Sequence, residues 1–146
     1  MRMEFGVVAA LCLTAQLAQA ADCATVLEKT ASERHLTNIG NGETHAHFRD
    51  GPQIQVSVGC ELGKPNVQVS WDGGSPDKAF YDLVGRLGQA VSGSKPSQVV
   101  QAAKSCRQQA LQDGGEIGQV EQPGLAVECQ AFSRDGGGTT ISVYAD

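Results

Sequence analysis

Two histidines that are one residue apart are the most suggestive chemical feature of this sequence. His45 and His47 lie in a segment whose residue types fit a short strand. Side chains at positions i and i+2 of a strand share a face, so both imidazoles could approach one metal ion, such as zinc or copper. His35, Glu43 or Asp50 could add a further ligand. Solvated histidines on an edge strand explain the same residues, so His45 and His47 are weak candidates and no metal is assigned.

The cysteines favour structural disulfides over redox or metal chemistry. Of the five cysteines in the chain, Cys12 lies in an N-terminal segment that we expect to be removed. The remaining even number fits an oxidising compartment and consists of Cys23, Cys60, Cys106 and Cys129. Because none of them forms a C-x-x-C pair, neither a tetrahedral zinc site nor a dithiol redox motif is predicted. Four cysteines allow three pairings, and the spacing does not choose among them.

Motifs for nucleophilic or phosphate chemistry are weak or lacking in the sequence. There is no G-x-S-x-G elbow. The glycine-rich segments 40–42 and 134–138 lack the strand-to-helix context of a phosphate loop, and segment 72–77 lacks the acid spacing of a calcium loop. Turns explain all three segments. No carboxylate pair is selected by the sequence, so we expect no cofactor, and an enzyme is the less favoured class.

Residues 1–20 have the pattern of an export signal. Arg2 precedes an apolar stretch that runs roughly from Phe5 to Ala18, and the segment 18–20 is a small-x-small cleavage signature. The stretch is shorter than the roughly 20 residues that span a bilayer, and no later stretch approaches that length. We therefore expect residues 1–20 to be a signal peptide. Residues 21–146 should form a single disulfide-stapled domain that is periplasmic or secreted and is not held in a membrane.

The charge balance argues against nucleic acid as a partner. The chain has 11 Lys and Arg against 16 Asp and Glu, for a net charge of −5. Residues 1–20 carry one charge of each sign, so their removal leaves this balance unchanged. No basic run is present to displace the counterions of a phosphate backbone. The apolar content of 40% is enough for the core of one compact domain.

Hydrophobic periodicity places these residues on helices and strands. A helix is expected over 22–35 with Asp22 as its N-cap, followed by a loop over 36–43 and strands over 44–49, 53–60 and 66–71. Ser75 is expected to cap a helix over 76–91. A second helix begins at Pro96, ends before the glycines at 114–115 and turns Cys106 toward the core. Strands over 117–121, 125–131 and 139–143 complete the pattern.

The two halves of the chain share a pattern. In each half a helix with a cysteine precedes a strand that ends or continues as Val-x-Cys, at 58–60 and at 127–129, and a further alternating strand follows. Two repeated α-β-β-β units would pair Cys23 with Cys60 and Cys106 with Cys129, and each disulfide would tie a helix to a strand. The alternative is that the similarity of the two halves is a coincidence, because antiparallel meanders with alternating valines are common.

Together these observations predict a two-layer α+β fold with an antiparallel sheet of five or six strands, helices on one face and two disulfides. Phe132 and Tyr144 occupy outward positions and are the candidates for binding a partner, unless a further helix covers that face. We expect a secreted or periplasmic, non-enzymatic protein-binding module of the inhibitor or immunity kind. The alternative is a small periplasmic hydrolase or a metal-binding protein that uses His45 and His47.

Overall fold

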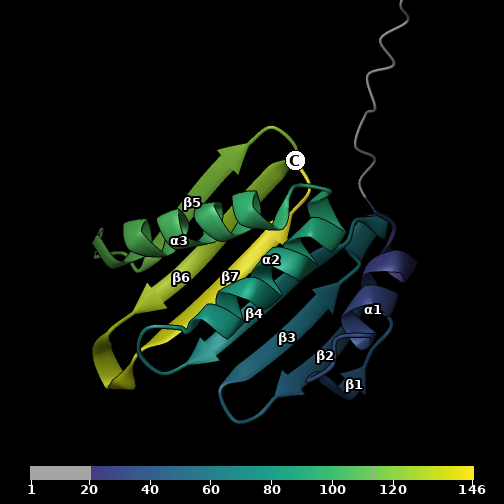
Figure 1. The fold of residues 1–146 in the computed structure, drawn as a ribbon, viewed down its shortest axis with the longest axis horizontal. Helices are drawn as coiled ribbons and strands as arrows, with labels where there is room; N and C mark the ends of the chain where they lie inside the picture. Colours follow the sequence, from purple (N-terminus) through teal and green to yellow (C-terminus); the bar gives the residue numbers. More distant parts are fainter. Residues whose placement is uncertain (1–20, 113) are drawn as a thin grey trace, which may run out of the picture.

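The structure, a computed structural model, describes residues 21–112 and 114–146, and the predicted signal peptide lies outside these ranges. The described residues form a two-layer α+β fold in which three α-helices cover one face of a seven-stranded antiparallel sheet (Figure 1). The predicted fold class is therefore confirmed, with one or two more strands than expected. Among the described residues, no helix is both long enough and apolar enough to cross a membrane.

The strand order in the sheet is β1-β2-β3-β4-β7-β6-β5, and all neighbours are antiparallel. Two short 3₁₀ turns, η1 (Glu61–Gly63) and η2 (Arg134–Gly136), join strands. The bounds of the helices and strands, in chain order, are α1 (Cys23–Ala31), β1 (Thr37–Asn41), β2 (His45–Asp50), β3 (Ile54–Gly59), β4 (Asn66–Asp72), α2 (Lys78–Ser92), α3 (Pro96–Gln112), β5 (Ile117–Gln122), β6 (Leu125–Phe132) and β7 (Gly138–Tyr144).

The sheet order is symmetric about the β4–β7 pair. On one side lie β4, β3 and β2, and on the other lie β7, β6 and β5. Helix α1 precedes the first set and packs near β3, whereas α3 precedes the second set and packs on β6. This arrangement matches the two expected α-β-β-β units joined by α2. Strand β1 is an additional edge strand of the first unit, which is why the sheet is wider than predicted.

The predicted loop over 36–43 is wrong, because β1 lies within it. Thr37 pairs with Arg49 and Asn41 pairs with Ala46, with a register shift between Asn38 and Gly40. The asparagines and glycines of this segment are typical turn residues, and its positions are mostly exposed. The segment is extended because β2 offers a pairing edge, a long-range cause that the local pattern does not contain.

The helix boundaries also differ from the prediction in two places. Asp22 caps α1 as expected by accepting a hydrogen bond from the Thr25 backbone at 2.8 Å, but α1 ends at Ala31 rather than at 35. The N-cap of α2 is Asp77 rather than Ser75, because the Asp77 carboxylate accepts a hydrogen bond from the Phe80 backbone at 2.9 Å. An acid at this position also suits the positive end of the helix dipole.

The core lies between the helices and the inner face of the sheet. Along β2, β3, β4, β6 and β7 the buried apolar positions alternate inward, as in the run 54–58 of β3. Helix α2 approaches α3 closely at Gly85 and Gly88, because a Cβ on Gly85 would lie only 2.9 Å from the Val100 side chain. The largest fully buried side chains are Phe80, Leu87, Leu125 and Ile141.

The cysteines form one disulfide and one close pair of thiols. Cys106 of α3 and Cys129 of β6 are bonded, with Cα atoms 5.9 Å apart, as the repeat predicted. Among the described residues Cys23 and Cys60 remain as thiols that lie close to each other. Burial raises the pKa of Cys60 to about 11, and the neighbouring Cys23 contributes to the rise. The prediction of two disulfides is thus met by one bond, and the second predicted pair is adjacent but unbonded.

Candidate functional site: the uncovered face of the sheet

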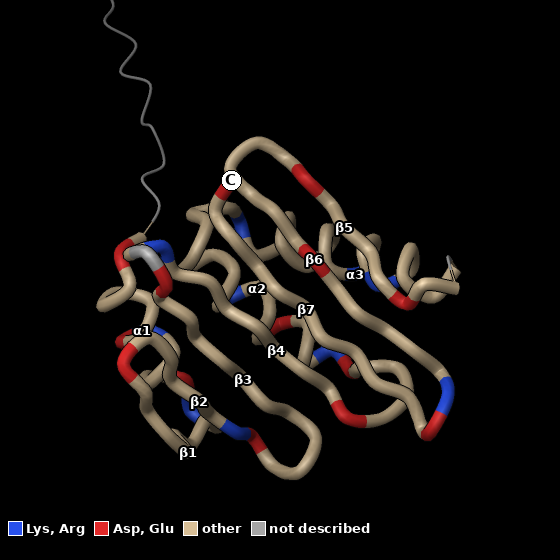
Figure 2. Tube along the Cα trace, turned by 180° about the vertical axis from the view of Figure 1, so that it is seen from behind, with Lys and Arg blue, Asp and Glu red and all other residues tan. Residues whose placement is uncertain are grey.

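All three helices lie on one side of the sheet, and no described element covers the other side, which we call the open face (Figures 1 and 2). Strand alternation assigns side chains to the two sides. In β4, Val67 and Val69 are fully buried toward the helices. Gln68 and Ser70, which alternate with them along the strand, lie on the open face. For residues 21–112 and 114–146, the alternative that a further helix covers this face does not hold.

The strand register aligns the side chains of the open face in rows that cross the sheet. Each row takes one residue from each of β2, β3, β4, β7, β6 and β5, because neighbouring strands pair without a shift in this part of the sheet. The middle row is His47, Ser57, Gln68, Ser142, Glu128 and Gln119. The next row is Arg49, Gln55, Ser70, Thr140, Gln130 and Ile117.

The centre of the open face carries amides and hydroxyls rather than charges. Strands β3 and β7 contain no Lys, Arg, Asp or Glu, and β4 contains only Asp72 at its end (Figure 2). The hydroxyls of Ser70 and Thr140 lie 3.1 Å apart across the central strand pair. Charged side chains, such as Arg49 and Glu128, flank this centre on the neighbouring strands. The central surface therefore offers neutral donors and acceptors to a partner.

A small hollow lies on the open face between β1 and β4. Its volume is about 270 Å³, and its lining includes Ile39, His47, Gln55, Ser57, Gln68 and Ser70. Small-molecule sites usually measure about 300–1,000 Å³, so this hollow fits a single side chain better than a drug-sized ligand. Apart from His47, none of these residues is a site candidate on sequence grounds. Gln55, Ser57, Gln68 and Ser70 occupy the polar positions of alternating strands, which is the signal for them, whereas Ile39 lies in the segment predicted as a loop.

Phe132 and Tyr144 both lie on the open face, but at opposite ends of it. Phe132 pairs with Gly138 at the start of β7, and Tyr144 ends the same strand, roughly 20 Å away. The Phe132 ring lies across Gly138, where a Cβ would be 2.5 Å from the ring, and the Arg134 guanidinium lies 4.9 Å from its centroid. The two residues predicted to bind a partner thus lie at separate places on the open face rather than in one aromatic cluster.

The two histidines share a face, as predicted. The rings of His45 and His47 are stacked, with centroids 6.3 Å apart and an angle of 3° between their planes. His45 also lies 2.8 Å from the Thr44 hydroxyl and 3.9 Å from the Glu61 carboxylate. Within the described ranges, no group of three or more His, Cys, Asp or Glu side chains is placed to hold a metal ion. The suggested third ligands, His35, Glu43 and Asp50, do not complete a site with the two histidines.

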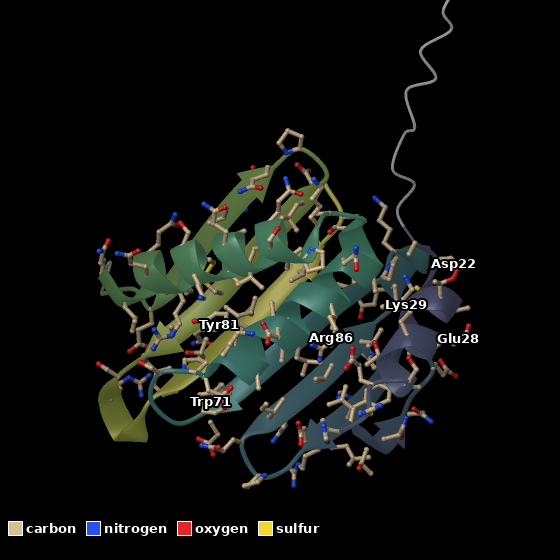
Figure 3. All side chains as sticks on the ribbon, in the orientation of Figure 1. Asp22, Glu28, Lys29, Trp71, Tyr81 and Arg86 are labelled. Carbon is tan, nitrogen blue, oxygen red and sulfur yellow. A yellow bond between two sulfur atoms is a disulfide. The ribbon has the colours of Figure 1, made fainter. Side chains whose placement is uncertain are left out.

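Two ion pairs with paired hydrogen bonds lie away from the centre of the open face. Arg86 of α2 lies on the helix side of the sheet (Figure 3). It donates two hydrogen bonds, of 2.9 and 3.0 Å, to Glu33 beyond α1. These bonds raise the pKa of Arg86 above its ordinary value. At the far corner of the sheet, Arg134 makes the equivalent pair with Glu116 and lowers the pKa of that carboxyl. The first pair fastens the turn after α1 to α2, and the second joins the turn before β5 to the turn between β6 and β7.

Comparison with protein-family models, with curated proteins and with solved structures finds no match to this chain. The class of protein is therefore defined by the fold and the candidate site themselves. It is a small two-layer α+β protein that presents a broad, uncovered sheet face with an uncharged centre.

Proposed function

We propose that this chain is a non-enzymatic, periplasmic or secreted protein-binding module that contacts its partner through the open face. The observation that carries the proposal is the uncharged centre of an uncovered seven-stranded sheet. Specific protein interfaces are depleted of charged residues at their centre and have a polar rim. The export pattern of residues 1–20 and the Cys106–Cys129 disulfide support the proposed compartment.

The dimensions of the open face suit a protein partner. Seven strands at about 4.8 Å spacing, each about 20 Å long, cover roughly 600 Å² in plan. A standard interface buries about 800 Å² on each partner, which is of the same order. The hollow of about 270 Å³ beside His47 would take one side chain of the partner. The open face is larger than the contact area of a small ligand, and its hollow is smaller than a usual small-molecule pocket. Both dimensions favour a folded protein as the partner.

The rigidity of this surface favours an inhibitor or immunity role. The open-face side chains stand on strands that are hydrogen-bonded on both sides from β2 to β6. A partner would therefore meet a preformed surface and lose little free energy to ordering it. Such a surface suits a protein that blocks another protein by covering it.

The test is capture of a partner by matched variants. Gln68→Arg places a charged side chain at the centre of the open face, and Gln101→Arg makes the same change on α3, on the helix side. Both glutamines are exposed, so both variants should fold with unchanged circular dichroism. The wild type should retain a stoichiometric protein from a periplasmic or culture-fluid extract, and Gln68→Arg should weaken that complex by about tenfold or more.

The outcomes separate the site from the function. Retention of the partner by Gln101→Arg and its loss from Gln68→Arg would support the open face as the binding surface. Equal binding by both variants would exclude it. If the wild type instead turns over a substrate and captures no protein from these extracts, the alternative of a small hydrolase replaces the proposal.

A further inference from the structure

The two outer strands of the sheet differ in how they are protected. The edge strand β1 is bent by the register shift between Asn38 and Gly40. The Asn38 side chain accepts a hydrogen bond from the Gly40 backbone at 3.1 Å and donates one to Asn41 at 2.8 Å. A bulge and side chains that occupy backbone groups are the usual means by which natural proteins prevent pairing at an edge.

Strand β5, at the other edge, has no bulge, and the side chain found on its outward backbone groups is that of Gln109, which accepts a long hydrogen bond of 3.4 Å from the Gln119 N–H. Its register with β6 is unbroken from Ile117 opposite Gln130 to Gln122 opposite Leu125. Its sequence, IGQVEQ, contains no proline and no lysine. Ile117 is 66% exposed, more than either of the other exposed large apolar side chains of the described residues, Ile39 and Leu111. A straight edge strand of this kind is a template for pairing with another strand.

The hydrogen-bond alternation identifies the backbone groups that β5 offers. The Ala131 backbone donates to the Glu116 carbonyl at 2.9 Å, so even-numbered residues at this edge bond to β6. The N–H and C=O groups of the odd-numbered residues therefore point outward, away from β6. In agreement, the outward N–H of Gln119 is met by the Gln109 side chain from α3, at a long 3.4 Å. The outward-pointing residues of β5 are Ile117, Gln119 and Glu121.

We propose that β5 pairs antiparallel with β5 of a second copy of this chain. Matching the outward-pointing residues of both strands fixes one register. In it Gln119 lies opposite its own counterpart, and Ile117 lies opposite Glu121 of the other copy. This register makes about six backbone hydrogen bonds and places the two-fold axis at Gln119. The Gln109 side chain gives up its long contact with the strand as the second copy arrives.

The charge distribution explains why a second copy fits here despite a net charge of −5. The only charged residue of β5 is Glu121, and in this register it faces an isoleucine rather than the other Glu121. Beside β5, a groove of about 470 Å³ is lined by uncharged residues of α3 and β5. Two copies therefore approach through an edge with little like-charge repulsion. The residues that line this groove are Gln109, Gln112, Ile117, Gly118 and Gln119.

The pairing would extend the sheet and its open face. A two-fold axis perpendicular to the sheet keeps the helices of both copies on one side and both open faces on the other. In Figure 1, β5 is the outermost strand on the α3 side, so α3 of each copy would flank the junction. The inference is independent of the proposed function, since the dimer is defined by β5 and α3 alone.

Substitution of the exposed isoleucine on each edge strand, Ile117 on β5 and Ile39 on β1, tests the proposal. Ile117→Glu places a carboxylate opposite Glu121 at both ends of the junction, whereas Ile117→Lys places an ammonium there. Ile39→Glu makes the control change on β1, where Ile39 is 53% exposed. Sedimentation equilibrium should give a dimer for the wild type, for Ile117→Lys and for Ile39→Glu. The dissociation constant of Ile117→Glu should be higher by about tenfold or more.

Each other outcome would overturn the inference. A wild-type protein that remains monomeric in the most concentrated sample excludes the dimer. A dimer that Ile117→Glu does not weaken has its interface elsewhere. A dimer that Ile39→Glu weakens as much as Ile117→Glu does not depend on β5. Unchanged far-ultraviolet circular dichroism of the variants, all of which change exposed side chains, separates loss of pairing from loss of folding.

Discussion

The thiol of Cys60, just after β3, lies next to the thiol of Cys23 at the start of α1, close enough for Cys23 to contribute to the raised pKa of Cys60. This pair is the counterpart, in the first α-β-β-β unit, of the Cys106–Cys129 disulfide in the second, although Cys23 begins α1 whereas Cys106 lies in the middle of α3. In both units a cysteine of the helix meets a cysteine of, or directly after, the central strand. The correspondence links the internal repeat in the sequence to a repeated way of fastening helix to sheet.

A second disulfide between Cys23 and Cys60 should form in the oxidised protein, because the two thiols are already neighbours. A peptide map without reductant should contain a Cys23–Cys60 peptide beside the Cys106–Cys129 peptide. Replacing either pair with serine should lower the free energy of unfolding by about 3 kcal/mol, from the loop that each bond closes. A linked Cys60–Cys129 peptide would contradict both the repeat and the structure.

Gly118 of β5 should not tolerate a side chain. A Cβ at this position would collide with the Cys106 carbonyl of α3 and would lie 2.9 Å from the sulfur of Cys129. Gly118→Ala should therefore lower the free energy of unfolding by about 1–3 kcal/mol, measured by urea denaturation. Gly40→Ala is the control, because no atom lies within 4 Å of its Cβ position. Equal stability of the two variants would show that α3 does not press on β5 at this point.

The cap of α2 is testable by two neighbouring substitutions. Asp77 accepts the hydrogen bond from Phe80, and Ser75 makes no cap to this helix. Asp77→Ala should lower the free energy of unfolding by about 1 kcal/mol, and Ser75→Ala should change it by a small fraction of that. Thermal denaturation of both variants measures the difference. The reverse order would restore Ser75 as the cap that the sequence predicted.

Stability should fall at high pH because of Tyr81. This side chain is 8% exposed, and burial raises its pKa above the ordinary 10.0, while the nearby Arg107 opposes part of the rise. The folded chain keeps the phenol proton at a pH where the unfolded chain has released it. The contribution of Tyr81 is therefore fully present below pH 10 and is lost as the pH rises toward the folded pKa.

The measurement for Tyr81 compares wild type with Tyr81→Phe in urea denaturation at several pH values from neutral to alkaline. Phenylalanine does not ionise, so the variant should lose less stability than the wild type above pH 10. The Trp71–Phe80–Tyr81 edge-to-face packing survives this change, which keeps the comparison clean. Parallel pH profiles of the two proteins would mean that Tyr81 ionises alike in the folded and unfolded chain.

Much of the fold could be predicted from local patterns. The alternation of Ile54, Val56 and Val58 marks a strand with one buried face, and the structure has β3 there. Helical spacing and the glycines at 114–115 bound α3 well. The predicted bounds were wrong where an element forms because of pairing with a distant part of the chain. Strand β1 exists because β2 pairs with it, and its own residues are typical of a turn.

The candidate site was less predictable than the fold. The sequence placed Phe132 and Tyr144 on one face, which is where they lie, but it could not place them at opposite ends of β7. The row that joins His47 to Gln119 crosses strands from both halves of the chain. No local pattern contains these neighbours, since they depend on the pairing of β4 with β7.

The sequence by itself determined which side chains share a face of each strand and helix, because periods of two and 3.6 follow from backbone geometry. It also determined that Cys106 points toward the core, where the structure buries it. Only the tertiary structure decided the order of the strands, the side that the helices cover and the edge left without protection. Those features arise from pairings between residues far apart in the chain, such as Val69 with Ile141, whose free energy no short segment encodes.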